Sequence, residues 1–114
     1  MELNYRQVGE IQIPDMEAPE SPKIGKYGMM RFRYLRENKR PMFTTMMIEG
    51  NLNEHLEQID REATEMMERL TKQMAEKEGV TESLKAADQM KWVQMMNSIR
   101  NSAEETVLNE LILN

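Results

Sequence analysis

The sequence has no cysteine, one histidine and few aromatic residues, with three tyrosines, two phenylalanines and one tryptophan. Without cysteine, disulfides, zinc–thiolate sites and thiol nucleophiles are excluded for these 114 residues. No apolar run approaches the roughly 20 residues that a membrane-spanning helix needs. The first ten residues, MELNYRQVGE, have neither the basic start nor the apolar stretch of a signal peptide. These absences favour a cytoplasmic protein with no membrane contact.

Catalytic chemistry also has little support in the sequence. The single histidine, His55, lies at the margin of an apolar helical stripe, without a suitably spaced acid or nucleophile. There is no glycine-rich phosphate loop and no hydrolase-like motif. A carboxylate metal site in a helical protein would need glutamate and histidine three residues apart, whereas Glu54 and His55 are adjacent. We therefore expect no enzymatic activity, no metal, no cofactor and no small-molecule substrate.

Charge, by contrast, is plentiful and unevenly distributed. Residues 23–40 carry seven basic side chains and one acidic side chain, a net charge of +6, which leaves −11 for the rest of a chain of net charge −5. Such segregation indicates an anionic partner, or two copies that meet through opposite patches. The alternative is internal pairing, with the basic helix docked beside acidic ones.

Proline and glycine positions divide the chain into an arm and several helices. Residues 1–22 contain three prolines and short apolar pieces, which predicts an extended N-terminal arm, either two extended segments or a short β-hairpin. Residues 23–50 read as two short helices, basic and then methionine-rich, separated at Pro41. Residues 51–114 read as two long helices that meet near Gly79, with Asn51 and Thr81 as predicted N-caps.

The apolar pattern of residues 52–77 is the clearest helical signal. Its apolar positions fall within about 100° of arc and are spaced close to a coiled-coil heptad; they are Leu52, Leu56, Ile59, Ala63, Met66, Met67, Leu70 and Met74. A second stripe begins near Glu82 and runs towards the C-terminus. We therefore predict a single all-α domain over residues 1–114, a long antiparallel helical hairpin with shorter helices packed on it.

The basic segment is amphipathic when it is drawn as a helix. One stripe contains Lys23, Lys26, Arg33, Arg36 and Arg40, and the aromatic residues lie mostly on the opposite side. Because the aromatic rings then face the core, base stacking is disfavoured, whereas contact with phosphates or carboxylates remains open. Our candidate binding residues are Lys26, Arg33, Arg36 and Arg40. Arg31 falls on the apolar side, and we expect it to be partly buried beside a carboxylate from one of the long helices.

Several sequence segments together resemble the TnpV-type transposon-encoded proteins of bacterial mobile elements. They are QVGE, IPD, IGKYG, RYLRE, LNEHLEQIDREA, KQMAEKEGVTE, LKAADQMKWV, MNSIRN and ELI, which span nearly the whole chain. None is a catalytic motif, so the resemblance implies a context on a mobile element and transfers no site residues. It favours a non-enzymatic accessory protein that binds DNA, or an element recombinase on DNA, through the basic helix. The alternative is a helical protein–protein interaction module, acting as a homodimer or as an inhibitor through its acidic face, without nucleic acid.

Overall fold

A computed structural model describes residues 23–114, and every regular element in that range is a helix. The elements are α1 (Lys26–Asn38), α2 (Arg40–Glu49), α3 (Leu52–Glu78), α4 (Glu82–Ala87), α5 (Gln89–Val107) and a π-helical turn, η1 (Leu108–Ile112). The predicted all-α class is confirmed over these residues. The predicted arm at residues 1–22, including its hairpin alternative, lies outside the described residues.

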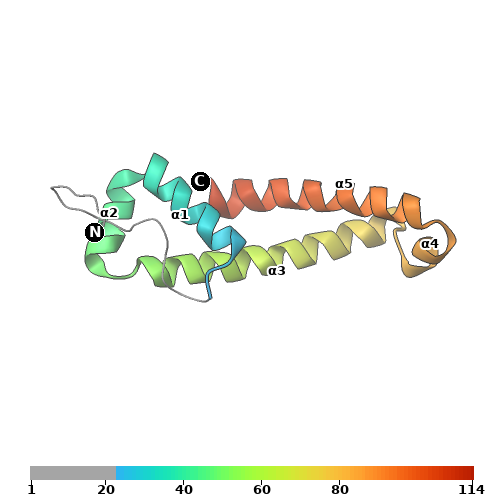
Figure 1. The fold of residues 1–114 in the computed structure, drawn as a ribbon, viewed down its shortest axis with the longest axis horizontal. Coiled ribbons are helices and arrows are strands. Elements are labelled where there is room, and N and C mark those ends of the chain that lie inside the picture. The colour runs from blue at the N-terminus through green and yellow to red at the C-terminus, as the bar shows by residue number, and fades with distance from the viewer. Residues whose placement is uncertain (1–22) are drawn as a thin grey trace, which may run out of the picture.

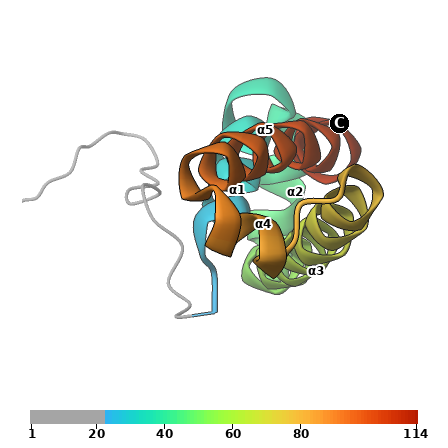
Figure 2. The same ribbon diagram turned by 90° about the vertical axis from the view of Figure 1, so that its right-hand side faces the viewer.

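The two long helices α3 and α5 lie side by side and run in opposite directions (Figure 1). The predicted antiparallel helical hairpin is therefore confirmed. It makes the described part of the chain an elongated body of 61 × 26 × 22 Å. Viewed end-on, α4 lies at the near end of the α3–α5 pair, with α1 and α2 at the far end (Figure 2).

Glycine ends two helices by adopting a left-handed conformation. Gly50 follows α2 with φ of 77°, and Gly79 follows α3 with φ of 73°, and each donates its backbone N–H to the last carbonyls of its helix. Only glycine takes this conformation without a steric penalty from Cβ. After Gly79, the Thr81 side chain accepts a hydrogen bond from the Leu84 backbone N–H at 3.3 Å and caps α4, as predicted.

Two details differ from the sequence prediction. The final helix does not run unbroken from Glu82, because Asp88 ends α4 and then caps α5 by accepting a hydrogen bond from the Lys91 backbone N–H at 3.1 Å. Aspartate competes well for free amide groups at a helix start, which favours a break there. Asn51 occupies the N-cap position of α3, but its side chain makes no capping hydrogen bond.

Three small apolar clusters follow one another along the rod, within the described residues. The first joins α1, α2 and α3 through Phe32, Leu35, Phe43 and Leu56. The second joins α3 to the C-terminal end of the chain through Ala63, Val107 and Ile112. The third, near α4, contains Val80, Met96 and Ile99. The core is therefore a line of clusters, and each cluster is stabilised mainly by the helices at its own level.

Candidate functional site

Basic side chains gather where α1 ends and α2 begins. We call this surface the basic corner; it comprises Arg33, Arg36, Lys39 and Arg40. Lys39 sits between the two helices with φ of −130° and ψ of 53°, outside the helical region, and Pro41 then occupies the first turn of α2. Proline lacks the N–H of a helix interior but fits the first turn, so the chain breaks and restarts here.

Two of the arginines are held in place by aromatic rings. The rings of Phe32 and Phe43 are buried and meet edge to face, with centroids 5.7 Å apart. The guanidinium of Arg36 lies 5.2 Å from the Phe32 centroid, and that of Arg40 lies 5.7 Å from the Phe43 centroid. Cation–π contact of this kind orients a guanidinium group. Because the two rings touch, the two guanidinium groups have a defined mutual position.

A hydrogen bond strengthens this arrangement across the helix break. Arg40 donates from Nη1 to the backbone carbonyl of Arg36 at 3.3 Å. That carbonyl belongs to the last turn of α1, where free carbonyl groups carry the negative end of the helix dipole. The bond therefore links the side chain of Arg40, a residue of α2, to the C-terminal end of α1.

The rest of the corner is open to solvent. Arg33 and Lys39 are exposed, and within residues 23–114 no carboxylate lies within ion-pair distance of either. Glu37 is the one acidic residue of the α1–α2 region near the corner, and its Oε2 lies 3.8 Å from Nη2 of Arg36. The corner therefore brings four basic groups together, a surface suited to an anion with several charges.

Lys26, the remaining predicted site residue, lies at the opposite end of α1. Its Nζ is 2.7 Å from Oε2 of Glu104 on α5, and the Tyr27 hydroxyl donates to the same oxygen at 3.1 Å. The bond from Lys26 holds the pKa of Glu104 below its usual value, and Glu104 in turn raises the pKa of Lys26. The structure therefore groups Arg33, Arg36 and Arg40 but separates Lys26 from them, as part of the α1–α5 contact.

Lys39 is the corner residue that the sequence analysis did not select. A helical wheel drawn through residues 23–40 assumes one continuous helix, and on that wheel Lys39 falls away from the basic stripe. The break at Lys39 places it beside Arg40 at the junction instead. Pro41 separated the two helices in the sequence prediction, but the wheel did not take into account that Lys39 then lies at the junction.

Arg31 is buried, at 5% exposure, which confirms its predicted place on the apolar side of α1. The predicted carboxylate partner is wrong. Arg31 donates from Nη1 to the Ile112 carbonyl at 2.9 Å and to Asn114 oxygens at 3.3 and 3.4 Å, and from Nε to Nε2 of His55 at 3.3 Å. Free carbonyls at the end of η1 thus supply the acceptors that a carboxylate would otherwise provide.

His55 is engaged in this structural contact. Burial and the nearby Arg31 charge lower its pKa, and Glu62 opposes them. For Nε2 to accept the bond from Arg31, the imidazole must be neutral with its proton on Nδ1. In residues 23–114 no three metal-ligating side chains come together. None of the described helices is long and apolar enough to span a membrane.

Fold and site together define an elongated helical hairpin with a basic corner at one end. The chain belongs to the family described as transposon-encoded protein TnpV, whose model matches residues 4–112. No curated protein and no solved structure compared with the chain matches it. The expected resemblance to this family is therefore confirmed over nearly the whole sequence.

Proposed function

We propose that this protein is a non-enzymatic accessory protein of a mobile element and binds the phosphate backbone of DNA through the basic corner. The observation that supports this most directly is that the guanidinium groups of Arg36 and Arg40 each lie over a buried phenylalanine ring. Guanidinium groups that are already oriented lose less conformational entropy when they bind a phosphate. The family's transposon origin supplies the context in which a DNA partner is expected.

The proposed contact is with phosphates, without readout of base sequence. The aromatic rings beside the corner, Phe32 and Phe43, are both buried, so they are not available to stack on bases. The corner lies at a bend between two helices, and neither helix extends freely into a groove. Phosphate contacts position a protein on DNA but carry no sequence information. We therefore propose that the DNA site is selected by another component, such as a recombinase on the same DNA.

The acidic balance of the chain limits this binding but does not exclude it. The whole sequence carries a net charge of −5. At physiological salt the Debye length is about 8 Å, so a phosphate at the corner is influenced mainly by nearby groups. The four basic groups of the corner then dominate locally. We expect weak to moderate affinity with a steep dependence on salt, because each phosphate contact releases counterions.

The first prediction concerns Arg33→Glu combined with Lys39→Glu, which reverses two exposed charges without removing the two arginines that lie over the phenylalanine rings. We expect its affinity for a labelled DNA duplex to fall by about tenfold or more at low salt, and its salt slope to lose about two units. Fluorescence anisotropy titrations between about 50 and 200 mM salt measure both quantities.

The matched control reverses Arg61 and Arg69, two exposed basic residues on α3, so both variants change the net charge equally. It should bind nearly as the parent does. If the parent chain shows no DNA binding at low salt, or the two variants weaken it equally, the basic corner is not a DNA site. The alternative, a protein-interaction module that uses its acidic helical face, would then take precedence.

A separate experiment tests whether the protein meets its partner through DNA or directly. Pull-down from a host that carries the element, with and without nuclease, distinguishes a DNA-bridged recombinase from a direct protein partner. We expect the recombinase to be recovered only without nuclease. Recovery that survives nuclease and also survives Arg33→Glu/Lys39→Glu would contradict the proposed role of the corner.

A further inference from the structure

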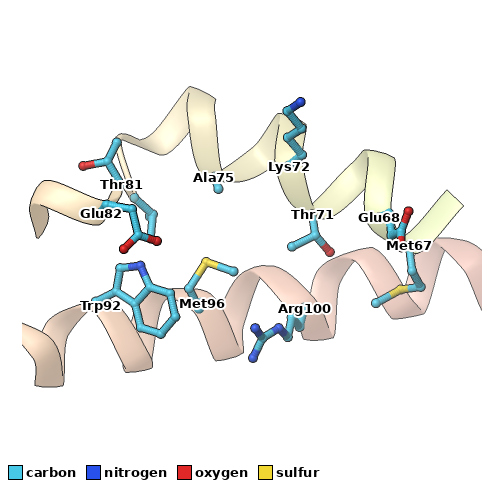
Figure 3. Close-up of a pocket in the computed structure, with 11 residues that line it drawn as sticks. Met67, Glu68, Thr71, Lys72, Ala75, Thr81, Glu82, Trp92, Met96 and Arg100 are labelled. Atoms are coloured by element: carbon cyan, nitrogen blue, oxygen red, sulfur yellow. The ribbon is translucent and has the colours of Figure 1, made fainter. Parts of the chain in front are cut away.

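A groove of about 490 Å³ runs between α3 and α5 in the half of the molecule nearest α4 (Figure 3). Its walls are mostly apolar, from Met67, Thr71, Ala75, Val80, Trp92 and Met96. In Figure 3 the side chains of Ala75, Trp92 and Met96 point into the space between the two helices, while the ammonium group of Lys72 points away from it. The groove is thus an apolar trough with charged groups at its edges.

The groove continues the surface on which α1 lies. On α5, Arg100 precedes by one turn Glu104, which accepts hydrogen bonds from α1. On α3, Met67 follows by two turns Asp60, which accepts a hydrogen bond from the Gly28 backbone N–H at 2.8 Å. Residues four or seven positions apart share a helix face. The face that α1 covers in one half of the hairpin is therefore uncovered in the other half.

Apolar side chains remain exposed beside this groove. Val93 is seven residues before Arg100, which places it at the edge of the groove on α5, and Met90, one turn before Val93, lies farther around the helix from the groove. Met90 is 72% exposed and Val93 is 39% exposed. The buried part of the adjoining core cluster consists of three residues, Val80, Met96 and Ile99, and Trp92 and Met95 beside it are half-buried. An open groove, exposed flanking residues and a thin core together indicate a surface that another helix covers.

The charges at the groove edges indicate what kind of helix covers the groove. Lys72 and Arg100 are basic, and Glu68 and Glu82 are acidic, so the rim is balanced and contains both signs. A two-fold axis brings the same patch of two copies together, and such a patch can pair its own opposite charges across the axis. A strongly basic or strongly acidic partner would gain no comparable advantage from this rim. We propose that a second copy of this chain packs on the groove, as a two-fold symmetric dimer.

In this dimer the α4 halves of two hairpins pack together as an antiparallel four-helix arrangement. The edge of each α5 beside the groove, with Val93 and the neighbouring Met90, covers the α3–α5 groove of the other copy. Antiparallel bundles bury apolar stripes in this way. Met67 and Met96 in the walls are flexible side chains that adapt to an opposing surface. The basic corner lies at the other end of each hairpin and takes no part in the contact.

The second prediction tests the apolar contact by sedimentation equilibrium of the full chain. We expect the parent protein to dimerise reversibly, and Met90→Glu/Val93→Glu to raise the dissociation constant by about tenfold or more. The matched control is Met42→Glu/Ile48→Glu, which places the same charges on two exposed apolar residues of α2. It should dimerise as the parent does. A parent that stays monomeric, or a control that dissociates equally, overturns the proposal.

The rim charges allow a second test that does not depend on the apolar substitutions. Lys72→Glu/Arg100→Glu makes the four rim groups acidic, and Glu68→Lys/Glu82→Lys makes them basic. Each variant alone should dissociate, whereas an equimolar mixture should restore dimers by pairing unlike chains. The control mixture uses Arg69→Glu/Lys91→Glu with Glu65→Lys/Glu105→Lys, all at exposed positions that do not line the groove.

We expect each control variant to form dimers by itself, as the parent does. Failure of the rim mixture to form dimers overturns the two-fold arrangement, even if the parent self-associates. Arg33→Glu/Lys39→Glu should still dimerise, because the basic corner is outside the interface. Dimerisation and DNA binding can therefore fail independently of each other.

Discussion

At the residue scale, Arg31 shows how a buried charge is accommodated without an acid. Removing a guanidinium from water is costly unless its N–H groups find acceptors. Here the acceptors are the His55 imidazole and the carbonyl groups at the end of η1. Partners such as Ile112 lie 81 positions away in the sequence, so a helical wheel identifies the burial of Arg31 but not what it binds.

The third prediction follows from the neutral state of His55. Burial and Arg31 hold its folded-state pKa below its ordinary value of 6.5. Below pH 6.5 the unfolded chain therefore takes up a proton more readily than the folded chain does, and the free energy of unfolding falls as pH falls through this window. Urea denaturation at a series of pH values from 7.5 to about 5.5 measures the loss, since the unfolded-state pKa is near 6.5.

The control is His55→Gln, which keeps an oxygen that can accept the Arg31 bond but removes the titrating ring. Because His55 is the only histidine, no other histidine contributes to this pH window. The variant should show a flatter stability profile than the parent between pH 7.5 and about 5.5. Equal slopes in the two proteins would show that His55 is as easily protonated when folded as when unfolded.

At the element scale, α1 is seated on α3 through two glycines. Gly28 donates its N–H to Asp60, so a side chain of α3 caps the start of α1, which has no capping side chain of its own at Gly25. The role of Gly28 is close approach, since a Cβ there would lie 3.1 Å from the Leu56 carbonyl oxygen and 2.6 Å from Cγ2 of Ile24.

The fourth prediction is that Gly28→Ala destabilises the protein although alanine favours helices. Alanine gains about 1 kcal/mol of helix propensity over glycine in a helix interior. The forced separation of two packed backbones costs more, and we expect a net loss of about 1–2 kcal/mol in the free energy of unfolding, measured in urea. Gly25→Ala is the control, because its Cβ would meet Asp60 oxygens no closer than 3.4 Å.

We expect the Gly25 variant to lose less, about 0.5–1 kcal/mol, because alanine is a poorer N-cap than glycine but meets no close contact there. A Gly28 variant as stable as the parent would mean that α1 can shift on α3 without loss.

The helices differ in how well the sequence defines them. The ends of α3 follow from local signals, a glycine at each side and a continuous apolar stripe, and they were predicted to within a residue or so. The last helix was not, because Asp88 breaks it with a side-chain bond that has no strong pattern in the sequence. In the candidate site, Arg33, Arg36 and Arg40 were selected from their spacing, and the structure places them near one another. The stacking that orients two of them depends on α1 and α2 meeting, which no local pattern reports.

At the scale of the whole molecule, the two halves of the hairpin receive unequal support. Near the basic corner, α1 and η1 cover the long helices, whereas near α4 only that short helix does. The fifth prediction is that amide hydrogens of residues 68–78 and 89–96 exchange about tenfold or more faster than those of residues 56–63 and 99–107 in dilute protein. Exchange in the first set should slow as protein concentration rises, because the proposed second copy would cover it.

Met90→Glu/Val93→Glu should remove that concentration dependence, while the difference between the two halves remains. Hydrogen exchange monitored by mass spectrometry resolves both effects. Uniform protection along the hairpin would contradict the unequal support inferred from the core clusters.

The length of the hairpin determines how far apart the basic corners of two joined copies would lie. The basic corner and the groove lie towards opposite ends of a body 61 Å long. Two copies joined at their grooves therefore hold their basic corners farther apart than one turn of B-DNA, about 34 Å. Such a pair does not match adjacent half-sites on one duplex face. Under the proposed dimer and the proposed phosphate contact, this geometry favours two separate duplex segments, one at each end, with the helical hairpins as the spacer between them.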